Sequence, residues 1–340
     1  MRSNVVRSMV LMLVTLFMNC AGPSSSHLFQ RTFFKFDTVV TIKITDRSVD
    51  EKSFHALMKE VKKILDHYDE IFNMYNKKSS LFRITKFKAG QQYPLNSDIY
   101  QLLKEVKRFY KLTEGYFDPT IGSVTQLYDF TGERKMPSGE DLKKALEKVG
   151  MEHVVLIEPH YVILNRAPVR FDLGGAAKGY IIDKIARFLK NTEINDFLIN
   201  IGGDIFVSGD NPYGKKWKIG LQDPRNKSQI ITQFDLTDSS VVSSGDYERF
   251  FIYKGKRYHH IIDPFTGYPI DNNIISVTVV AGNALLADIL STSVFLLGRE
   301  KGIALLKKFK TKYVLIEETA DKGMEFYSNF LKIKKDKGFY

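Results

Sequence analysis

The sequence predicts a fold that mixes α-helices and β-strands, of the α+β or mixed α/β class. Segments with the three- and four-residue spacing of amphipathic helices are mixed with strand-like segments, without a strict strand–helix–strand repeat. The chain has 340 residues, 44% hydrophobic and 26% charged, which is ample material for a packed core. Because there is only one cysteine, that core must hold together without an internal disulfide.

The first residues have the pattern of an export signal. Arg2 and Arg7 precede a short apolar run over residues 10–18, which is too short to span a bilayer but suits a secretory signal peptide. The sole cysteine, Cys20, follows this run and precedes small residues, which resembles the lipid-attachment site of a bacterial lipoprotein. An ordinary signal peptide with an incidental cysteine is the alternative.

These features divide the chain into a signal peptide over residues 1–19, a lipidated N-terminus and flexible tether over residues 20–28, and a single folded domain over residues 29–340. We expect an exported protein, lipid-anchored at the periplasmic face of the bacterial inner membrane. The formal net charge of +11 favours an anionic membrane surface or a phosphorylated ligand. Because the lysines are scattered and no nucleic-acid motif is present, we expect no nucleic-acid partner.

The first half of the domain is expected to begin with a strand and to continue with helices. Residues 33–45 alternate and are rich in β-formers, which predicts the first strand. Apolar residues recur at helical steps over residues 54–72, and a second helix is expected over residues 97–114, with Gly115 as its C-cap. Residues 138–141 resemble a capping box and begin a third helix.

The same patterns predict the elements that follow. Residues 217–260 have the pattern of strands over most of their length, with a hairpin tip over residues 253–258. The other expected elements are a hairpin over residues 154–157 and 162–164, helices over residues 177–190 and 284–297, and strands over residues 197–201, 275–280, 314–316 and 330–333.

The helix over residues 284–297 carries one aspartate among small and apolar residues. Asp288 and Thr292 lie four residues apart, so they share one face of this helix. A carboxylate and a hydroxyl at that spacing can both face a hard cation, and magnesium prefers oxygen ligands. Alternatively, Asp288 pairs with a lysine or caps a neighbouring helix, because an unpaired buried charge is costly.

The stretch YHHIIDPFTGYP, residues 258–269, runs from an expected strand into a turn. His260 could act there as a general base near neutral pH. Alternation along a strand sends His259 and His260 to opposite faces, so at most one of them reaches a site from this strand. A purely structural histidine is the alternative.

Between residues 170 and 183, a strand-like run leads through Asp172 and two glycines into a helix. Either Gly174 and Gly175 let the chain reverse while Asp172 caps the helix, or the turn brings the backbone close to a phosphate or a metal. Neither a Walker loop nor a GxGxxG fingerprint is present. The stretches NIGGDI and VVSSGDYERFF repeat the theme, and such turns can converge at one edge of a sheet.

Taken together, these segments resemble the ApbE family of FAD:protein FMN transferases. The matching stretches follow the family's order: FDT, YFDPTIGSV, FDLGGAAKGYIID, NIGGDI, WKIGLQDP, SSGDYERFF, HIIDPFTGYP and ADILST. Each motif is weak alone, but eight in order are specific, and they cover the chain from about residue 33 to its C-terminus. The resemblance implies a fold of mixed, largely antiparallel sheets with packed helices.

The resemblance also implies an activity. The protein would be a Mg²⁺-dependent enzyme that cleaves FAD at its pyrophosphate, attaches FMN to a threonine hydroxyl of another protein and releases AMP. By the same resemblance, the acceptor would be an envelope redox protein. Metal ligands would be Asp288, Thr292 and the main-chain oxygen of Gly175, and His260 would take the proton from the threonine. Asp172 and Lys178 would contact the flavin nucleotide, as would Phe36, Asn73, Tyr75, Ser123, Val124, Thr125 and Ile262.

The sequence departs from the family pattern around the nucleotide. Phe36 and Asp37 replace Met-Gly, Asn73-Met74-Tyr75 stands where the family commonly has Ser-Thr and an aromatic residue, and Ser123 replaces a common proline. Water could therefore serve as acceptor in place of threonine, which would make the protein an FAD pyrophosphatase that yields FMN and AMP. A lipoprotein that binds FAD without chemistry is a third reading.

Overall fold

The structure, a computed structural model, describes residues 27–130, 136–331, 333–334 and 338–339. The expected signal peptide over residues 1–19 and the expected lipidation site, Cys20, lie outside the described residues, as does most of the tether. No helix within the described part of the chain is long and apolar enough to cross a membrane.

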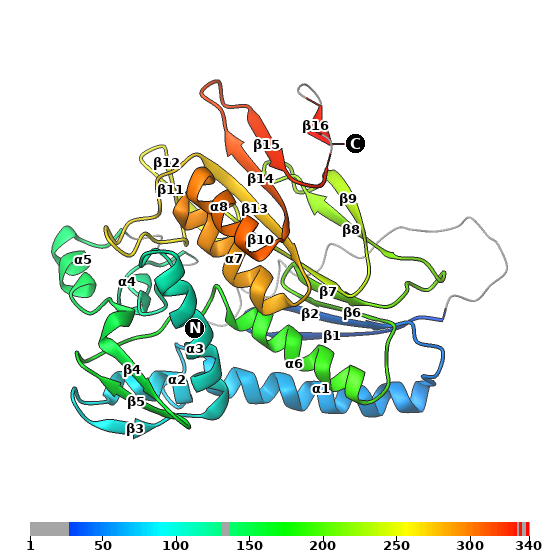
Figure 1. Cartoon of the computed structure of the whole chain (residues 1–340), viewed down its shortest axis with the longest axis horizontal. Coiled ribbons are helices and arrows are strands. Elements are labelled where there is room, and N and C mark those ends of the chain that lie inside the picture. The colour runs from blue at the N-terminus through cyan, green and yellow to red at the C-terminus, as the bar shows by residue number, and fades with distance from the viewer. Residues whose placement is uncertain (1–26, 131–135, 332, 335–337, 340) are drawn as a thin grey trace, which may run out of the picture.

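An eight-stranded sheet forms the middle of the molecule (Figure 1). Every neighbouring pair of its strands is antiparallel, which confirms the expectation of largely antiparallel sheets. In spatial order the strands are β1 (Phe29–Lys35), β2 (Thr38–Ile44), β6 (Phe197–Ile201), β7 (Asp204–Ser208), β10 (Ser239–Gly245), β13 (Ile274–Ala281), β14 (Lys312–Glu318) and β15 (Met324–Ser328).

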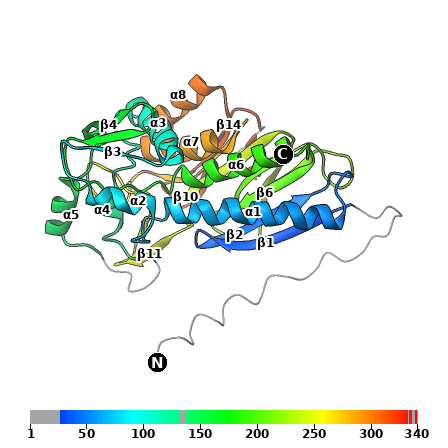
Figure 2. The ribbon, with the colours of Figure 1, turned by 90° about the horizontal axis from the view of Figure 1, so that it is seen from below.

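Helices cover one face of this sheet and a hairpin covers the other (Figures 1 and 2). On the first face lie α1 (Glu51–Phe72), α6 (Ala177–Asn191) and α7 (Ala284–Leu297), and their apolar residues form the larger core with the sheet. On the second face, β8 (Trp217–Gln222) and β9 (Ile230–Leu236) pack on the alternate residues of the same strands. Because successive residues of a strand point to opposite faces, the sheet can be apolar on both.

Smaller elements surround this centre. The remaining helices are α2 (Ser80–Arg83), α3 (Ser97–Leu112), α4 (Gly122–Thr125), α5 (Gly139–Leu146) and α8 (Arg299–Phe309), with short 3₁₀ helices η2 (Ile84–Lys86) and η3 (Met151–His153). The remaining strands are β3 (Gln92–Pro94), β5 (Tyr161–Leu164) and β4 (Val154–Ile157) in one sheet, the hairpin β11 (Phe250–Tyr253) and β12 (Lys256–His259), and the pair β16 (Ile333–Lys334) and β17 (Gly338–Phe339).

Two of the predicted helices, α1 and α7, form for different physical reasons. Helix α1 is amphipathic: Asp50 caps its first turn by accepting from the N–H of Ser53 at 2.8 Å, and its apolar stripe is buried. Helix α7 is apolar around most of its circumference because it contacts α6 and α8 as well as strands β10 and β13. Asp288 is therefore carried into the interior.

Several segments that are far apart in sequence lie at the same end of the strands of the central sheet, which we call the sheet edge. The turn between β1 and β2, the turn between β6 and β7 and the end of β10 all lie at this edge, because neighbouring strands run in opposite directions. The N–H of Gly202 donates to the carbonyl oxygen of Val39 at 3.0 Å and ties the first two turns together. The two glycine-containing segments among them, NIGGDI and the end of β10, thus converge at one sheet edge, as their recurrence in the sequence suggested.

The single first strand expected over residues 33–45 is wrong. The structure has a hairpin there, β1 and β2, with Phe36 and Asp37 as its two-residue turn. Both turn residues have positive φ, 56° and 55°, which a two-residue hairpin turn of type I′ requires. No glycine or asparagine marks the turn, so the alternation of the two strands reads through it as one strand.

Two other boundaries also differ from expectation. The second helix ends at Leu112 and its C-cap is Thr113, whereas Gly115 lies just beyond with φ 90°. The strand expected over residues 330–333 is mostly wrong: β15 ends at Ser328, Phe330 and Leu331 lie in a bend, and only residue 333 begins a further short strand. Apolar side chains in that bend, including Phe330, pack on the hairpin face of the sheet and so mimic a strand pattern.

Candidate functional site

Two helices cross closely where the predicted metal and nucleotide residues meet. A β-carbon at Gly179 of α6 would lie 2.4 Å from the carbonyl oxygen of Ala284 in α7, so only glycine permits this approach. Farther along α6, Asp183 accepts hydrogen bonds from the N–H groups of Ala284 (2.8 Å) and Leu285 (3.0 Å). These donors belong to the first turn of α7, so the carboxylate caps that helix and fixes its position against α6.

Asp288 is buried at this crossing, with 3% of its surface exposed. Its Oδ2 accepts from the N–H of Gly179 at 3.0 Å, so the alternative that it caps a neighbouring helix is confirmed for one oxygen. The nearby Lys178 pairs with Asp204 instead, and no other basic side chain in the described ranges forms an ion pair with Asp288. Burial raises the pKa of Asp288 to about 7, and the charge of Asp204 adds to the rise.

Hydroxyl and main-chain groups gather one turn farther along α7. A β-carbon at Gly175 would lie 3.0 Å from Oγ1 of Thr292, so the glycine main chain packs directly against that hydroxyl. Ser244, near the end of β10, has its Oγ 3.1 Å from Oγ1 of Thr292 and 2.8 Å from Oγ of Ser291. The structure thus brings Gly175, from the turn before α6, against Thr292 of α7. Asp288 lies one turn earlier on α7.

The atoms available here are all oxygen donors. They are one carboxylate, hydroxyl groups and the main chain of a glycine turn, and hard cations such as Mg²⁺ take such ligands. No cluster of three or more His, Cys, Asp or Glu side chains that could hold a metal ion is found among the described residues. A cation here would therefore depend on hydroxyl and main-chain oxygens as well as on Asp288, and the residues present fit Mg²⁺.

A buried ion pair lies beside this oxygen cluster. Lys178 Nζ is 2.6 Å from Oδ2 of Asp204, the first residue of β7, which is 2% exposed. Burial alone would lower the pKa of Lys178, but the charges of Asp204 and Asp288 outweigh it, so the pKa is raised. Lys178 therefore keeps its positive charge at neutral pH, and its half-buried side chain can still reach a ligand.

The two histidines occupy different environments, as alternation predicts. His259 is 7% exposed and its ring packs edge-on against Phe295, with 5.5 Å between ring centroids. His260 is half-buried, and its Nδ1 lies 3.3 Å from the carbonyl oxygen of Arg249. Because a carbonyl oxygen can only accept, this contact assigns the proton to Nδ1 and leaves the lone pair of Nε2 free. Burial lowers the pKa of His260 to about 3, so its ring is neutral at neutral pH.

Arg249 brings a second positive charge to this edge. It lies opposite His260 across the base of the β11–β12 hairpin, where its carbonyl oxygen also accepts from the N–H of His260 at 3.0 Å. Its side chain is exposed and forms no ion pair within the described ranges. After burial, its charge is the main cause of the low pKa of His260, and it also acts on the pKa of Lys178. Two cations beside a neutral imidazole favour a phosphorylated ligand.

Three predicted flavin-site residues lie on turns. Phe36 forms half of the β1–β2 turn described above. Asn73 ends α1, and its Oδ1 accepts from the N–H groups of Tyr75 (3.0 Å) and Asn76 (3.2 Å), so its side chain stabilises the turn. Tyr75 is 65% exposed. Partial burial raises the pKa of the Tyr75 phenol, the charge of Asp172 adds to the rise and the charge of Arg249 opposes it, so Tyr75 lies within electrostatic range of both side chains.

The short helix α4 contains Ser123, Val124 and Thr125. Val124 is fully buried and shares an apolar cluster with Ile262, so two predicted positions far apart in sequence meet. The hydroxyl of Thr125 is also buried and has no hydrogen-bond partner within the described ranges. Such an unsatisfied group gains when a polar ligand atom reaches it.

Asp172 stabilises the glycine turn and does not cap α6. Its Oδ1 accepts from the N–H of Gly174 at 2.9 Å, and its own N–H donates to the carbonyl oxygen of Pro119 at 2.7 Å. Helix α6 begins after Ala176, which makes no cap bond of its own, and the side chain that accepts from the first turn of α6 is that of Asp288. The N–H of Ala177 donates to Leu173 and that of Gly179 to Asp288. The N–H of Lys178 has no acceptor within the described ranges, so a ligand could satisfy this donor, as the chemical reading of the turn requires.

Sequence reasoning assigned no role to four residues at this site: Asp204, Ser244, Arg249 and Ser291. The first three belong to NIGGDI and VVSSGDYERFF, the stretches in which glycine turns and acids recur. The recurrence marks the segments but does not tell which side chain reaches the site. Ser291 has no signal of its own, because it is one small residue of a buried helix.

A separate hollow of about 650 Å³ lies between α3, α6 and α7. Asp183, Arg187 and Phe206 are among the residues that line it, and none of the predicted site residues does. The residues brought together at the sheet edge are therefore the better candidate for the chemistry, because the charges, the free imidazole nitrogen and the oxygen cluster are all found there.

Comparisons with known proteins identify the family of the chain. The model of the ApbE family matches residues 36–315. A curated Treponema pallidum protein called FAD:protein FMN transferase is 31% identical over 308 residues, which cover 86% of this chain and 84% of that one. A Vibrio cholerae protein of the same name is 30% identical over 281 residues, which cover 82% and 84%. The solved structure of flavin transferase ApbE from Vibrio cholerae superposes with a TM-score of 0.80 at 28% identity, covering 89% of this chain and 97% of that one.

Proposed function

The chain belongs to the ApbE family, and we propose that it is an FAD:protein FMN transferase. The observation that supports this most directly is the meeting of Gly175, Asp288 and Thr292 beside Lys178. An oxygen cluster next to a fixed cation is what cleavage of a diphosphate demands, because negative charge builds up on the oxygens around phosphorus.

The proposed reaction exchanges one phosphorus–oxygen bond for another. The hydroxyl oxygen of a threonine in the acceptor protein bonds to the phosphorus on the flavin side of FAD. The bond from that phosphorus to the bridging oxygen breaks, and AMP leaves with the bridging oxygen. The proton of the threonine hydroxyl passes to a base, and FMN stays on the acceptor as a phosphoester.

His260 is the residue we propose as that base. Its Nε2 keeps a free lone pair, because Nδ1 faces the carbonyl oxygen of Arg249. The pKa of His260, about 3 without ligand, is low for a base. A bound diphosphate adds negative charge opposite Arg249 and Lys178, and this raises the pKa of the imidazole toward the range in which proton transfer is efficient.

Lys178 and Arg249 hold the diphosphate in this proposal, and the glycine turn and α6 N-terminus receive its oxygens. Mg²⁺ fits the site held by Asp288, Thr292 and the main chain of Gly175, and when bound it would offset the negative charge of the diphosphate. The apolar cluster of Val124 and Ile262 is buried, so in this proposal it supports the wall of the flavin site from behind.

We further propose that the protein is exported and lipid-anchored through Cys20 at the periplasmic face of the inner membrane, where its acceptors would be envelope redox proteins. The export pattern of the first residues supports this. Replacing Cys20 by serine should move the protein from the membrane fraction to the soluble periplasmic fraction without loss of activity. Wild-type protein found soluble in the same fractionation would contradict the anchor.

The activity is tested by incubating the purified protein with FAD, Mg²⁺ and an envelope redox protein that carries a flavin-accepting threonine. We expect an FMN adduct on the acceptor, detected by flavin fluorescence in a denaturing gel and by mass spectrometry, together with AMP. An acceptor with that threonine replaced by alanine is the control. Free FMN with AMP and no adduct would favour hydrolysis, and unchanged FAD would favour binding alone.

The same assay tests the role of His260 in transfer. His260→Ala should slow adduct formation about 100-fold or more, since a general base contributes that much. FAD affinity should change little, because the imidazole is neutral and is not among the proposed diphosphate contacts. An unchanged rate of adduct formation in this variant would remove His260 from the mechanism.

A further inference from the structure

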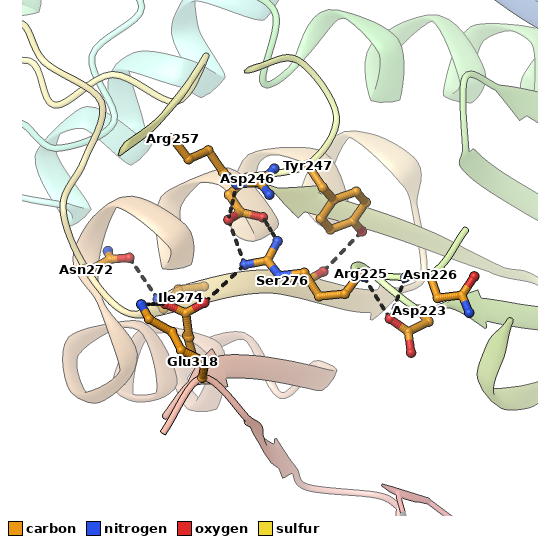
Figure 3. A network of polar contacts seen from close by, with 11 residues as sticks. Asp223, Arg225, Asn226, Asp246, Tyr247, Arg257, Asn272, Ile274, Ser276 and Glu318 are labelled. Carbon is orange, nitrogen blue, oxygen red and sulfur yellow. Dashed lines mark hydrogen bonds and ion pairs between the residues drawn. The ribbon is translucent and has the colours of Figure 1, made fainter. Parts of the chain in front are cut away.

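A buried carboxylate joins three segments next to the site (Figure 3). Asp246 is 8% exposed and directly follows β10. Arg225 grips it with both ends of its guanidinium group: Nη1 lies 2.7 Å from Oδ1 and Nη2 lies 3.0 Å from Oδ2. This bidentate pairing fixes direction as well as distance, which a single point charge cannot do.

A second arginine approaches the same carboxylate from the histidine-bearing hairpin. Nε of Arg257, in β12, lies 3.5 Å from Oδ2 of Asp246. Its guanidinium is held over the ring of Phe250 at 3.9 Å from the centroid, which restricts where it can point. Asp246 therefore joins the end of β10 both to the loop after β8 and to β12, which lie far apart in the sequence (Figure 3).

Each end of this cluster is itself anchored. The loop that carries Arg225 is turned by Asp223, whose Oδ1 accepts from the N–H of Arg225 at 2.7 Å. The N–H of Asp246 donates to the carbonyl oxygen of Ile275 at 3.1 Å, in the neighbouring strand β13. The next residue, Tyr247, places its hydroxyl 3.4 Å from Oγ of Ser276. The carboxylate is thus part of a rigid frame rather than of a loose surface loop.

Stability alone does not explain why charges are kept here. The cost of removing charged groups from water often equals or exceeds their attraction, so a well-packed apolar replacement of a buried ion pair is commonly neutral or stabilising. What such a pair does provide is a defined arrangement of the segments that it joins. Here those segments lie next to the proposed catalytic groups.

Residues close to Asp246 in the sequence contact both the oxygen cluster and the proposed base, His260. Two residues before it, Ser244 contacts Oγ1 of Thr292 in the oxygen cluster at 3.1 Å. Three residues after it, Arg249 offers its carbonyl oxygen to Nδ1 of His260. On β12, Arg257 lies three residues before His260. A shift of this carboxylate would therefore change the position of the imidazole relative to the oxygen cluster.

We propose that Asp246, gripped by Arg225 and Arg257, is a positioning residue that sets His260 against the oxygen cluster of α7. This inference rests on the proposed function. A displacement of about 1 Å in a catalytic group can cost about 100-fold in rate. In transfer, the threonine hydroxyl is held by the acceptor protein and can be deprotonated only if His260 lies in the matching position. In hydrolysis, the attacking water is small and can adjust to a displaced His260. Loss of the frame should therefore reduce transfer more than hydrolysis.

The test uses a variant that removes both members of the bidentate pair. Arg257 and Glu318, which lie 3.5 and 3.9 Å from the pair, keep side chains that are 30% and 36% exposed, so water can solvate their charges. Arg225→Met combined with Asp246→Leu replaces the pair by apolar side chains, which is expected to leave the protein folded. With FAD, Mg²⁺ and the acceptor protein described above, we expect adduct formation to fall at least about 10-fold and the ratio of free FMN to adduct to rise. The dissociation constant for FAD, measured by flavin fluorescence, should stay within about 2-fold of wild type.

Two further variants complete the design. Arg225→Lys keeps the charge but loses the fork, so its transfer rate should lie between wild type and the double variant. The matched control is Arg299→Met with Glu317→Leu, which removes another arginine–carboxylate pair, 2.8 Å long, away from the site. This control should keep the wild-type ratio of free FMN to adduct.

The outcomes separate this inference from the proposed function. A folded double variant with the wild-type rate and ratio would overturn the positioning role while the proposed function stands. Transfer and hydrolysis that fall in equal proportion would also overturn it, because loss of folded protein reduces both alike. Wild-type protein that forms no adduct under the same conditions would contradict the proposed function itself.

Discussion

The strongest electrostatic conflict in the site concerns one side chain. Asp288 is buried, and burial together with the charge of Asp204 raises its pKa to about 7. Burial therefore disfavours the ionised carboxylate, and a nearby cation would favour it. Its Oδ2 is engaged by the N–H of Gly179, and no hydrogen bond to its Oδ1 is found within the described ranges. The residue is therefore destabilised in a way that a bound cation would relieve.

Asp288→Asn is expected to abolish both transfer and hydrolysis of FAD, with a loss of at least about 100-fold. The amide oxygen can still accept from the N–H of Gly179, so the free energy of unfolding should not fall. Adduct and AMP formation report the activity, and urea unfolding reports the stability. Wild-type turnover in the folded variant would refute the metal assignment.

Backbone strain at the β1–β2 turn is concentrated in single residues. Asp37 has φ 55°, a region that costs a residue with a β-carbon about 1–2 kcal/mol. Asp37→Gly should therefore raise the free energy of unfolding by about 0.5–1 kcal/mol, after allowing for the greater freedom of glycine in the unfolded chain. Asp37→Val is the matched control and should lower it, because a β-branched residue tolerates this conformation poorly. Equal stability of all three proteins would show that the turn is unstrained.

The sequence predicts a site residue well when its unusual character is visible from its neighbours in the sequence. An aspartate within an otherwise apolar helix stands out without knowledge of the fold, and that is why Asp288 could be singled out. Arg249 and Asp204 were not assigned, because each gains its role from a partner that only the strand pairing or the packing brings near: His260 across a hairpin for the first and Lys178 for the second. A single sequence does not record such partners.

At the scale of elements, the site depends on how closely α6 and α7 cross. Gly179 allows the crossing, and Asp183 fixes it by capping α7. The same crossing brings Lys178 close enough to Asp288 for their charges to interact. Helix packing and the electrostatics of the site are therefore set by the same contact.

Gly179→Ala tests this contact directly. The added methyl group would lie 2.4 Å from the carbonyl oxygen of Ala284, so the helices must move apart. We expect the free energy of unfolding to fall by about 2 kcal/mol or more, with a loss of transfer activity. Gly282→Ala, just before α7, is the control, since nothing lies within 4 Å of a β-carbon there. Thermal unfolding should distinguish the two; similar melting temperatures would mean that the crossing is loose.

The elements themselves were predictable where one rule dominates. Helix α1 differs from expectation only at its start, because its apolar periodicity decides it, and α7 has the expected bounds because its long run of small and apolar residues is helical in length. The β1–β2 hairpin was missed because its turn uses Phe36 and Asp37 in a backbone conformation that the sequence does not announce. Strand β15 was misplaced because apolar residues in the bend after it pack, partly buried, against the sheet without forming a strand.

At the scale of the whole molecule, the order of strands in the sheet brings the site together. Strands β7, β10 and β13 are neighbours although they lie far apart in the sequence, so Asp204, Ser244 and the segment leading from His260 to β13 approach one edge. The fold class could be predicted from the mixture of periodicities, whereas this order could not, because many orders bury the same apolar faces. Resemblance to a family supplied what the periodicities lacked.

The buried histidine makes the stability of the whole molecule depend on pH. Burial lowers the pKa of His259 to about 4, from 6.5 in the unfolded chain, so between these values the unfolded chain binds a proton that the native state refuses. The free energy of unfolding should therefore fall by up to about 3 kcal/mol from this group as the pH drops from about 6.5 to about 4. Asp118 acts in the opposite sense, because burial raises its pKa from 3.8 to about 6.

The contribution of His259 can be isolated by comparing wild type with His259→Asn. Asparagine cannot titrate, but its Oδ1 can accept from the N–H of Ile261 as Nδ1 of the histidine does at 3.3 Å. The sole tryptophan, Trp217, is buried and reports unfolding in urea by its fluorescence. The difference between the two free energies of unfolding should be constant above about pH 7 and should move in favour of the variant by about 3 kcal/mol near pH 4. Because Asp118 is present in both proteins, its opposite effect cancels in the difference. A difference in the free energy of unfolding that does not change with pH would show that His259 becomes charged in the native state as easily as in the unfolded chain.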